Sequence, residues 1–365
     1  MRALLASLLW SICLAAGAAG VDYPPVRQDG AIELPADHGA HPAFRVEWWY
    51  VTGWLDAVED GKPLQLGFQI TFFRVRPGLQ ENNPSRFAAR QVLFAHAALS
   101  DPQHGRLRHA ERTARAGFGL AQAATGELDL RIDDWTMRRE AGADGEAIHA
   151  HAAGRDFSYD LRLAPTQPVL RNGVRGFSQK AADPRHASHY YSLPQLAVSG
   201  RVRRDGRVLE VTGRAWFDHE WSSEYLPAGA SGWDWIGINL DDGGALMAFR
   251  MRGTDGASLW AGGTLRRADG SVETFAPQAV AFEPVREWTS PRTGSRYPVA
   301  MRIRLATSRG PLVGELAPLI DDQELDSRQS TGAVYWEGAV RLSTGGKEAG
   351  RGYLELTGYR ERLRM

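Results

Sequence analysis

Apolar residues recur at every second position in many short stretches of this chain. The clearest stretch places Leu64, Leu66, Phe68, Ile70 and Phe72 on one face. Because successive side chains of a β-strand point to opposite faces, this pattern predicts a half-buried strand. The same reasoning predicts strands at residues 48–55, 91–99, 128–135, 157–163, 196–202, 209–217, 233–240, 245–251, 259–265, 299–305, 333–342 and 353–359.

Short turns rich in Asp and Gly separate these stretches. They lie at residues 59–61, 144–145, 204–206, 241–243, 269–270 and 344–346. Such pairs supply the positive φ angles that tight hairpins require. Only residues 87–90 and 117–124 are candidate helices, and both are short. Many short strands joined by hairpins predict an antiparallel all-β protein, and their number favours two barrels over one.

The first 20 residues have the composition of a secretory signal peptide. Arg2 precedes an apolar run, which ends in small residues, and cleavage is expected between Ala18 and Asp22. A buried N-terminal helix or a retained anchor is the alternative. We therefore expect a secreted or periplasmic protein. Lipid attachment at Cys13, the one cysteine, fits poorly because bulky residues precede it, so the exported chain would have no thiol.

The charge balance of the chain and changes in composition along it indicate which partners and which domain boundaries to expect. Lys plus Arg and Asp plus Glu are both 43, a balance that argues against a nucleic-acid partner. Residues 21–44 are rich in proline and polar residues and are expected to form an irregular lead-in. We expect an N-terminal β-domain over residues 45–215 and a C-terminal β-domain over residues 216–365. No oligomeric state is predicted.

The densest group of reactive side chains is Asp218, His219, Glu220 and Trp221. On a strand, Asp218 and Glu220 share one face, and His219 and Trp221 share the other. A histidine beside an aromatic wall is suited to acid–base catalysis, and nearby carboxylates could orient its ring. The alternative is a strand end whose charges form structural ion pairs. We take these four residues as the candidate catalytic group.

Other aromatic and polar side chains are candidates for binding the substrate, although core or interface packing would also explain them. They are Glu47, Trp48, Tyr50, Gln69, His96, His189, Tyr190, Tyr191, Trp233 and Trp235. His96 lies on an apolar strand, a setting more typical of a core histidine. A zinc site would require His96, His189 and His219 to converge, which their spacing does not support. We therefore predict no metal and no cofactor.

Several of these motifs resemble the AttH/carotenoid 1,2-hydratase family, whose bacterial members are often called predicted secreted hydrolases. The resemblance rests on residues 47–53, 67–74, 95–99, 190–192, 218–223 and 232–235. It implies two consecutive lipocalin-like β-barrels and a pocket for a polyene or lipid-like molecule. Hydratases of the family use a histidine and a tryptophan that match His219 and Trp221. Their Tyr and Asp on a following strand have no counterpart in residues 245–250.

Two functions are consistent with these observations. In the first, Asp218 or His219 protonates an alkene, Trp221 stabilises the cation and Glu220 activates water, so that the protein hydrates or hydrolyses a hydrophobic molecule. In the second, the protein is a non-catalytic periplasmic carrier of a lipid or hydrophobic metabolite. The resemblance implies ABC-transporter components as partners of such a carrier.

Overall fold

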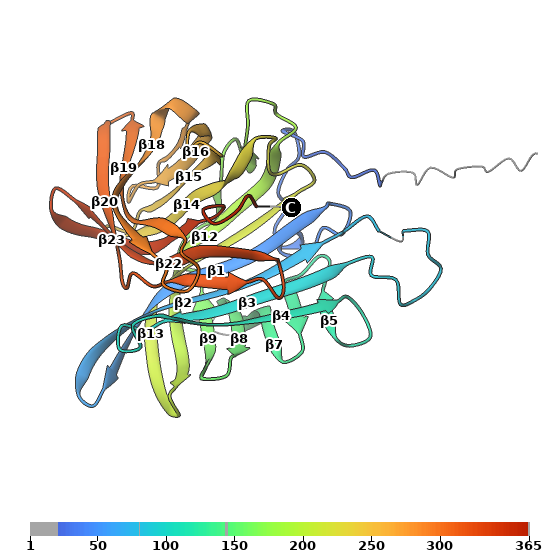
Figure 1. The fold of residues 1–365 in the computed structure, drawn as a ribbon, viewed down its shortest axis with the longest axis horizontal. Coiled ribbons are helices and arrows are strands. Elements are labelled where there is room, and N and C mark those ends of the chain that lie inside the picture. Colours follow the sequence, from blue (N-terminus) through green and yellow to red (C-terminus); the bar gives the residue numbers. More distant parts are fainter. Residues whose placement is uncertain (1–20, 80, 143–144, 364–365) are drawn as a thin grey trace, which may run out of the picture.

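The structure is a computed structural model that describes residues 21–79, 81–142 and 145–363. The expected signal peptide lies outside the described residues. Two antiparallel sheets make up the fold, and the only helical elements described are the 3-10 turns η1 (Ala36–His38) and η2 (Pro277–Ala279). Figure 1 shows the later sheet, in yellow to red, lying above the earlier one. The predicted all-β class with two lipocalin-like barrels is confirmed. None of the described helices is long and apolar enough to cross a membrane.

The first sheet contains strands from the first 222 residues of the chain. They are β1 (Val46–Glu59), β2 (Lys62–Val75), β3 (Val92–Ser100), β4 (Leu107–Arg115), β5 (Ala121–Ala123), β6 (Asp129–Ile132), β7 (Trp135–Gly142), β8 (Gly145–Ala153), β9 (Phe157–Ala164), β10 (Leu170–Arg171), β11 (Phe177–Gln179), β12 (Ala187–Arg204) and β13 (Arg207–Ser222). Their order is β4-β3-β2-β1-β13-β12-β9-β8-β7-β6-β5, with β10 and β11 paired to β12. The long central strands β1 and β13 therefore lie side by side.

The second sheet contains the rest of the strands. They are β14 (Ala230–Leu240), β15 (Ala245–Gly253), β16 (Ser258–Arg266), β17 (Val272–Phe275), β18 (Val280–Thr289), β19 (Arg296–Thr307), β20 (Gly310–Pro318), β21 (Glu324–Ser327), β22 (Ala333–Thr344) and β23 (Lys347–Leu356). Their order is β17-β16-β15-β14-β23-β22-β20-β19-β18, with β21 paired to β22. Strands β14 and β23, which come first and last in the chain among these strands, are neighbours in the middle of the sheet.

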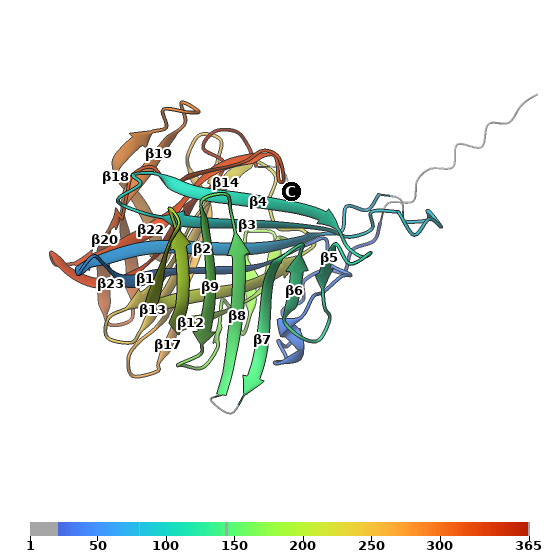
Figure 2. The same cartoon turned by 90° about the horizontal axis from the view of Figure 1, so that it is seen from below.

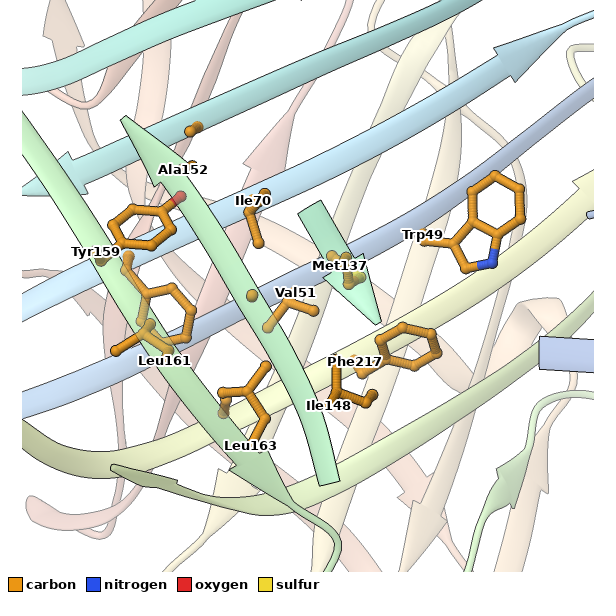
Figure 3. Close-up of a cluster of buried hydrophobic side chains, with 14 of the residues drawn as sticks. Trp49, Val51, Ile70, Met137, Ile148, Ala152, Tyr159, Leu161, Leu163 and Phe217 are labelled. Carbon is orange, nitrogen blue, oxygen red and sulfur yellow. The ribbon is translucent and has the colours of Figure 1, made fainter. Parts of the chain in front are cut away.

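The first sheet folds over to enclose its own hydrophobic core. In Figure 2, strands β6 to β9 cross strands β1 to β4 at a steep angle. Figure 3 shows Val51, Ile70 and Phe217 from one half pointing toward side chains from the other half. The facing side chains include Met137, Ile148, Tyr159, Leu161 and Leu163. The alternation predicted for residues 64–72 is confirmed, since Leu66, Phe68, Ile70 and Phe72 all belong to this core.

The middle of β1 and of β2 and residues 215–222 of β13 are buried on both faces, because their outer face packs against the second sheet. Trp54 of β1 donates from Nε1 to the backbone oxygen of Gly352 of β23, at 3.0 Å. Gly67 of β2 lies against Ala339 of β22 so closely that an added Cβ would come within 2.6 Å of the alanine Cβ. These strands form the wall between the two barrels.

Four expectations about local structure differ from what the structure shows. The expected division at residues 215 and 216 falls inside β13, and the chain passes to the second sheet between Ser222 and Ala230. The expected strand over 128–135 is two strands, because Asp133 turns with a φ of 53°. The helix candidate at 117–124 is a turn leading into β5, since Phe118 has a φ of 57°, which a right-handed helix cannot contain. Residues 87–90 are also not helical.

Candidate functional site

The alternation of β13 divides the four candidate catalytic residues between two separate places. Asp218 and Glu220 point to the second sheet and line a cavity between the sheets. Trp221 points into the first barrel, where it belongs to the core, and the His219 ring lies 4.8 Å from it between centroids. The structure therefore shows the predicted pairs, with Asp218 and Glu220 on one face of β13 and His219 and Trp221 on the other. The two pairs therefore cannot act on one substrate from the same side.

The cavity between the sheets has a volume of about 80 Å³ and is rich in aromatic and carboxyl groups. Its lining is Trp48, Tyr50, Thr71, Phe73, Tyr190, Asp218, Glu220, Tyr225, Trp233, Trp235, Tyr335, Glu337 and Glu355. A second, more apolar cavity of about 270 Å³ adjoins it and shares Trp48, Phe73, Trp233, Tyr335 and Glu355. Glu355 therefore lines both cavities.

Three donors surround the carboxyl group of Asp218. Trp216 Nε1 and the Ser192 hydroxyl donate to Oδ1 at 2.6 and 2.5 Å. The Tyr190 hydroxyl donates to Oδ2 at 2.7 Å and accepts from Trp235 Nε1 at 3.0 Å. Burial raises the pKa of Asp218 to about 7, and the three donors oppose that rise. Asp218 thus fixes Tyr190 in the cavity wall.

Glu220 differs from Asp218 because it has a cation as partner. Lys180 Nζ lies 2.7 Å from Glu220 Oε1, which also accepts from the hydroxyl of Ser188. The ammonium group lies 4.2 Å from the ring centroid of Phe249 and 5.0 Å from that of Tyr225. Burial raises the pKa of Glu220 and lowers that of Lys180, while each charge favours the other. The aromatic rings favour the charged form of the lysine.

Two further carboxyl groups enter the cavity from the second sheet. Glu337 of β22 and Glu355 of β23 are directly paired across the strands. Trp233 Nε1 donates to Glu355 Oε2 at 3.0 Å, and no ion pair in the described part of the chain includes either glutamate. Burial and, to a smaller extent, the charge of Glu220 raise the pKa of Glu355 to about 7, against the opposing effect of the hydrogen bond from Trp233. Burial and the charge of Glu355 also raise the pKa of Glu337. Glu355 is therefore suited to donate a proton near neutral pH.

On the other face of β13, His219 belongs to a buried polar cluster where the lead-in meets β1 and β13. Its Nε2 lies 2.9 Å from Glu47 Oε1, and His41 Nδ1 lies 2.7 Å from the same oxygen. Arg74 Nε donates to Glu47 Oε2 at 2.7 Å. Burial opposes the charge of Glu47, yet its hydrogen bonds to the two histidines and the charge of Arg74 hold its pKa well below the usual value. Burial lowers the pKa of His219.

The remaining candidate residues lie in several places. Trp48, Tyr50, Tyr190, Trp233 and Trp235 line the cavity between the sheets. Tyr191 and His189 lie in the first barrel, with ring centroids 5.4 Å from His219 and 5.2 Å from Trp221, respectively.

His96 and Gln69 lie apart from both of these groups. His96 Nδ1 is 2.8 Å from the Tyr335 hydroxyl, and burial lowers the pKa of His96 to about 3. Gln69 donates to Thr71 at 2.7 Å. His96 is therefore not near His219, and the three histidines considered for zinc do not converge.

Sequence reasoning missed several members of both groups. Glu337 and Glu355 lie more than 100 residues from β13, and Lys180 lies in a turn-rich stretch. Asp37 and His41 belong to the lead-in, whose proline-rich, polar sequence predicts irregular structure and carries no motif that marks reactive groups. One signal was present, because Tyr335-Trp336-Glu337-Gly338 repeats the character of residues 48–53 and places an acid beside the aromatics.

Comparisons with known proteins identify the family and the fold of the chain. A family model described as AttH-like matches residues 25–359. A crystal structure assigned to AttH, from Nitrosomonas europaea, is 50% identical, with a TM-score of 0.83, covering 92% of this chain and 99% of that one. Kievitone hydratase from Nectria haematococca is 14% identical, with a TM-score of 0.66, covering 94% of this chain and 97% of that one, so it shares the fold. Among curated proteins, no sequence matches.

Proposed function

The chain belongs to the AttH-like family, as its motifs predicted, and on that basis we propose that it adds water to a hydrophobic alkene in the cavity between its two sheets. The proposal rests on one observation, which is that two carboxyl groups in the same aromatic-walled cavity have different hydrogen-bond and ion-pair partners. Glu220 has Lys180 as its cation, whereas the donor to Glu355 among the described residues is the indole of Trp233. A hydratase among the proteins of the same fold supports the reaction class.

The two carboxyl groups supply the acid and the base that hydration requires. Glu355 gives its proton to one carbon of the alkene, and the neighbouring carbon becomes a cation. The faces of Trp48 and Trp233 stabilise that cation, an interaction of about 0.5–2 kcal/mol. Water attacks the cation and gives its proton to Glu220, so the product is an alcohol. Transfer of this proton from Glu220 back to Glu355 restores the starting state.

This proposal changes the roles expected from the sequence. Asp218 holds Tyr190 and takes no part in proton transfer to the substrate, because all its oxygen atoms accept from protein donors. His219 and Trp221 lie behind β13 and support the first barrel. We also propose that the reaction takes place in the periplasm or outside the cell, because residues 1–20 have the composition of a signal peptide.

The carrier function remains the second candidate, and the larger cavity favours it. Its lining is mostly apolar and includes Val46, Val75 and Phe94, which suits a lipid-like ligand. Such a carrier would deliver its ligand unchanged to ABC-transporter components. The two functions differ in a single measurable respect, which is whether the bound molecule gains the elements of water.

The test begins with native mass spectrometry of the protein purified from its source, to identify the hydrophobic molecule that it retains. That molecule is then incubated with the protein in ¹⁸O-labelled water. For a hydratase we expect incorporation of ¹⁸O, a loss of rate of about 10²–10⁴-fold in Glu355→Gln, and little change in ligand binding. Glu210→Gln, at an exposed position of β13, is the matched control.

Each alternative has its own result in this experiment. Retention of the ligand without ¹⁸O incorporation in the wild-type protein would establish the carrier. Incorporation at an unchanged rate in Glu355→Gln would exclude Glu355 as the acid.

A further inference from the structure

The polar cluster where the lead-in meets β1 and β13 brings together three atoms that commonly bind metals. They are His41 Nδ1 from the lead-in, Glu47 Oε1 from β1 and His219 Nε2 from β13, and they lie within 4.8 Å of one another. Both nitrogens face the same carboxylate oxygen, at 2.7 and 2.9 Å. The group is assembled from three segments that are distant in sequence.

The opposite nitrogen of each ring faces an acceptor atom of Asp37. His41 Nε2 lies 3.2 Å from the Asp37 carboxylate, and His219 Nδ1 lies 3.0 Å from the Asp37 backbone oxygen. An oxygen that can only accept requires a proton on the nitrogen it faces. Tyr191 also lies 3.2 Å from His219 Nδ1, but its hydroxyl is closer to His38 Nδ1, at 2.6 Å. If an ion takes the place of the inner proton, Asp37 accepts from the proton that remains on the outer nitrogen of each ring.

Glu47 Oε1 can also only accept, so without an ion the inner nitrogens donate protons to it. A divalent ion would replace these protons and place its charge among the same three atoms. We propose that a divalent metal ion of the zinc class binds here, held by His41 Nδ1, Glu47 Oε1 and His219 Nε2. Two imidazole nitrogens and one carboxylate are a donor set that zinc uses in proteins.

The surroundings hold these three groups in place as a metal site requires. The His41 ring stacks on Trp221 with centroids 3.8 Å apart and planes 5° apart, and the His219 ring stacks on Trp49 at 4.7 Å. Arg74 and the backbone N–H of His41 bind Glu47 Oε2, at 2.7 and 2.9 Å. Contacts of this outer kind, above all a carboxylate on the far nitrogen of a histidine, are characteristic of zinc sites.

Binding of the ion changes the distances among the three ligand atoms. Ligand atoms at about 2.0–2.1 Å from a tetrahedral zinc lie about 3.3 Å apart, so the two contacts to Glu47 would lengthen by about half an ångström. The two histidine nitrogens, which lie within 4.8 Å of each other, would take the same spacing. The side chain of His41 is 18% exposed, which gives the ion a route from solvent. The bound ion would join the lead-in to β1 and β13.

The experiment uses the full exported chain after treatment with a chelator, titrated with zinc chloride by calorimetry. We expect one zinc per chain and a higher midpoint of thermal unfolding with zinc. We expect His41→Ala to weaken binding by more than about 100-fold and Asp37→Ala to weaken it by about 10–100-fold, because outer contacts matter less than ligands. His151→Ala is the matched control, since this exposed histidine bonds to Asp160.

A second readout is independent of activity. With zinc bound, long-range ¹H–¹⁵N spectra should show protons on His41 Nε2 and His219 Nδ1 and none on the inner nitrogens. Circular dichroism establishes that each variant is folded, and His41→Ala removes a side chain outside the strands. The proposal is overturned if zinc does not bind in a 1:1 ratio, if His41→Ala binds as tightly as His151→Ala, or if the inner nitrogens still carry protons in the presence of zinc.

Discussion

At the scale of single residues, the protonation of Glu355 couples stability to pH. Burial raises its pKa to about 7 in the folded protein from an ordinary value of 4.5. The folded state therefore holds a proton that the unfolded state releases between these values. We expect this contribution to stability to be complete below about pH 4.5 and to be lost as the pH rises through about 7.

A comparison of variants isolates this effect from other titrating groups. The free energy of unfolding, measured with urea at pH 5 and pH 8, should fall more steeply with pH in the wild-type protein than in Glu355→Gln. The glutamine keeps an acceptor for Trp233 and does not titrate. Parallel pH profiles for the two proteins would contradict a raised pKa at Glu355.

The same scale shows what a sequence can say about a site. The alternation along β13 correctly separated Asp218 and Glu220 from His219 and Trp221, because faces of a strand follow from local period. Glu337 and Glu355 were missed because their approach to β13 depends on how the two sheets pack, which no local pattern encodes. His41 was missed because its role depends on where an irregular segment meets Glu47.

At the scale of elements, β2 shows how a strand between two barrels differs from an ordinary half-buried one. Its inner face packs in the first core, and its outer face lies against the second sheet at Gly67. A Cβ at Gly67 would lie 2.6 Å from the Cβ of Ala339 and 2.8 Å from the Tyr353 hydroxyl. The strand itself was predictable from its period, whereas the need for glycine at this position was not.

We therefore expect Gly67→Val to destabilise the protein by about 1–3 kcal/mol, because the added methyl groups force the sheets apart. Urea denaturation measures the change. Gly142→Val is the matched control, since it is also a strand glycine and has no side chain within 4 Å of an added Cβ. Equal stability of the two variants would show that the sheets separate at little cost.

At the scale of the whole molecule, the two sheets depend on each other. The face of the first sheet that carries Tyr50, Trp54 and Trp216 is buried in a cluster shared with Trp235 and Tyr353 of the second sheet. Two barrels were predictable from the number of strands. The close packing of the two barrels could not be predicted from the sequence. Aromatic residues on both faces of a strand are also found in strands buried within the core of a single domain.

This packing predicts that the first sheet does not behave as an independent domain. A shortened chain of residues 21–226 would expose Tyr50, Trp54 and Trp216 together, an apolar patch of the kind that leads to association. We expect that chain to bind a hydrophobic dye and to self-associate in sedimentation experiments, whereas the full chain should unfold in one cooperative transition followed by tryptophan fluorescence and circular dichroism. If residues 21–226 were instead monomeric and folded, the contacts between the sheets would be dispensable. The cavity proposed for catalysis could then open by separation of the barrels, so this result also bears on how a substrate enters.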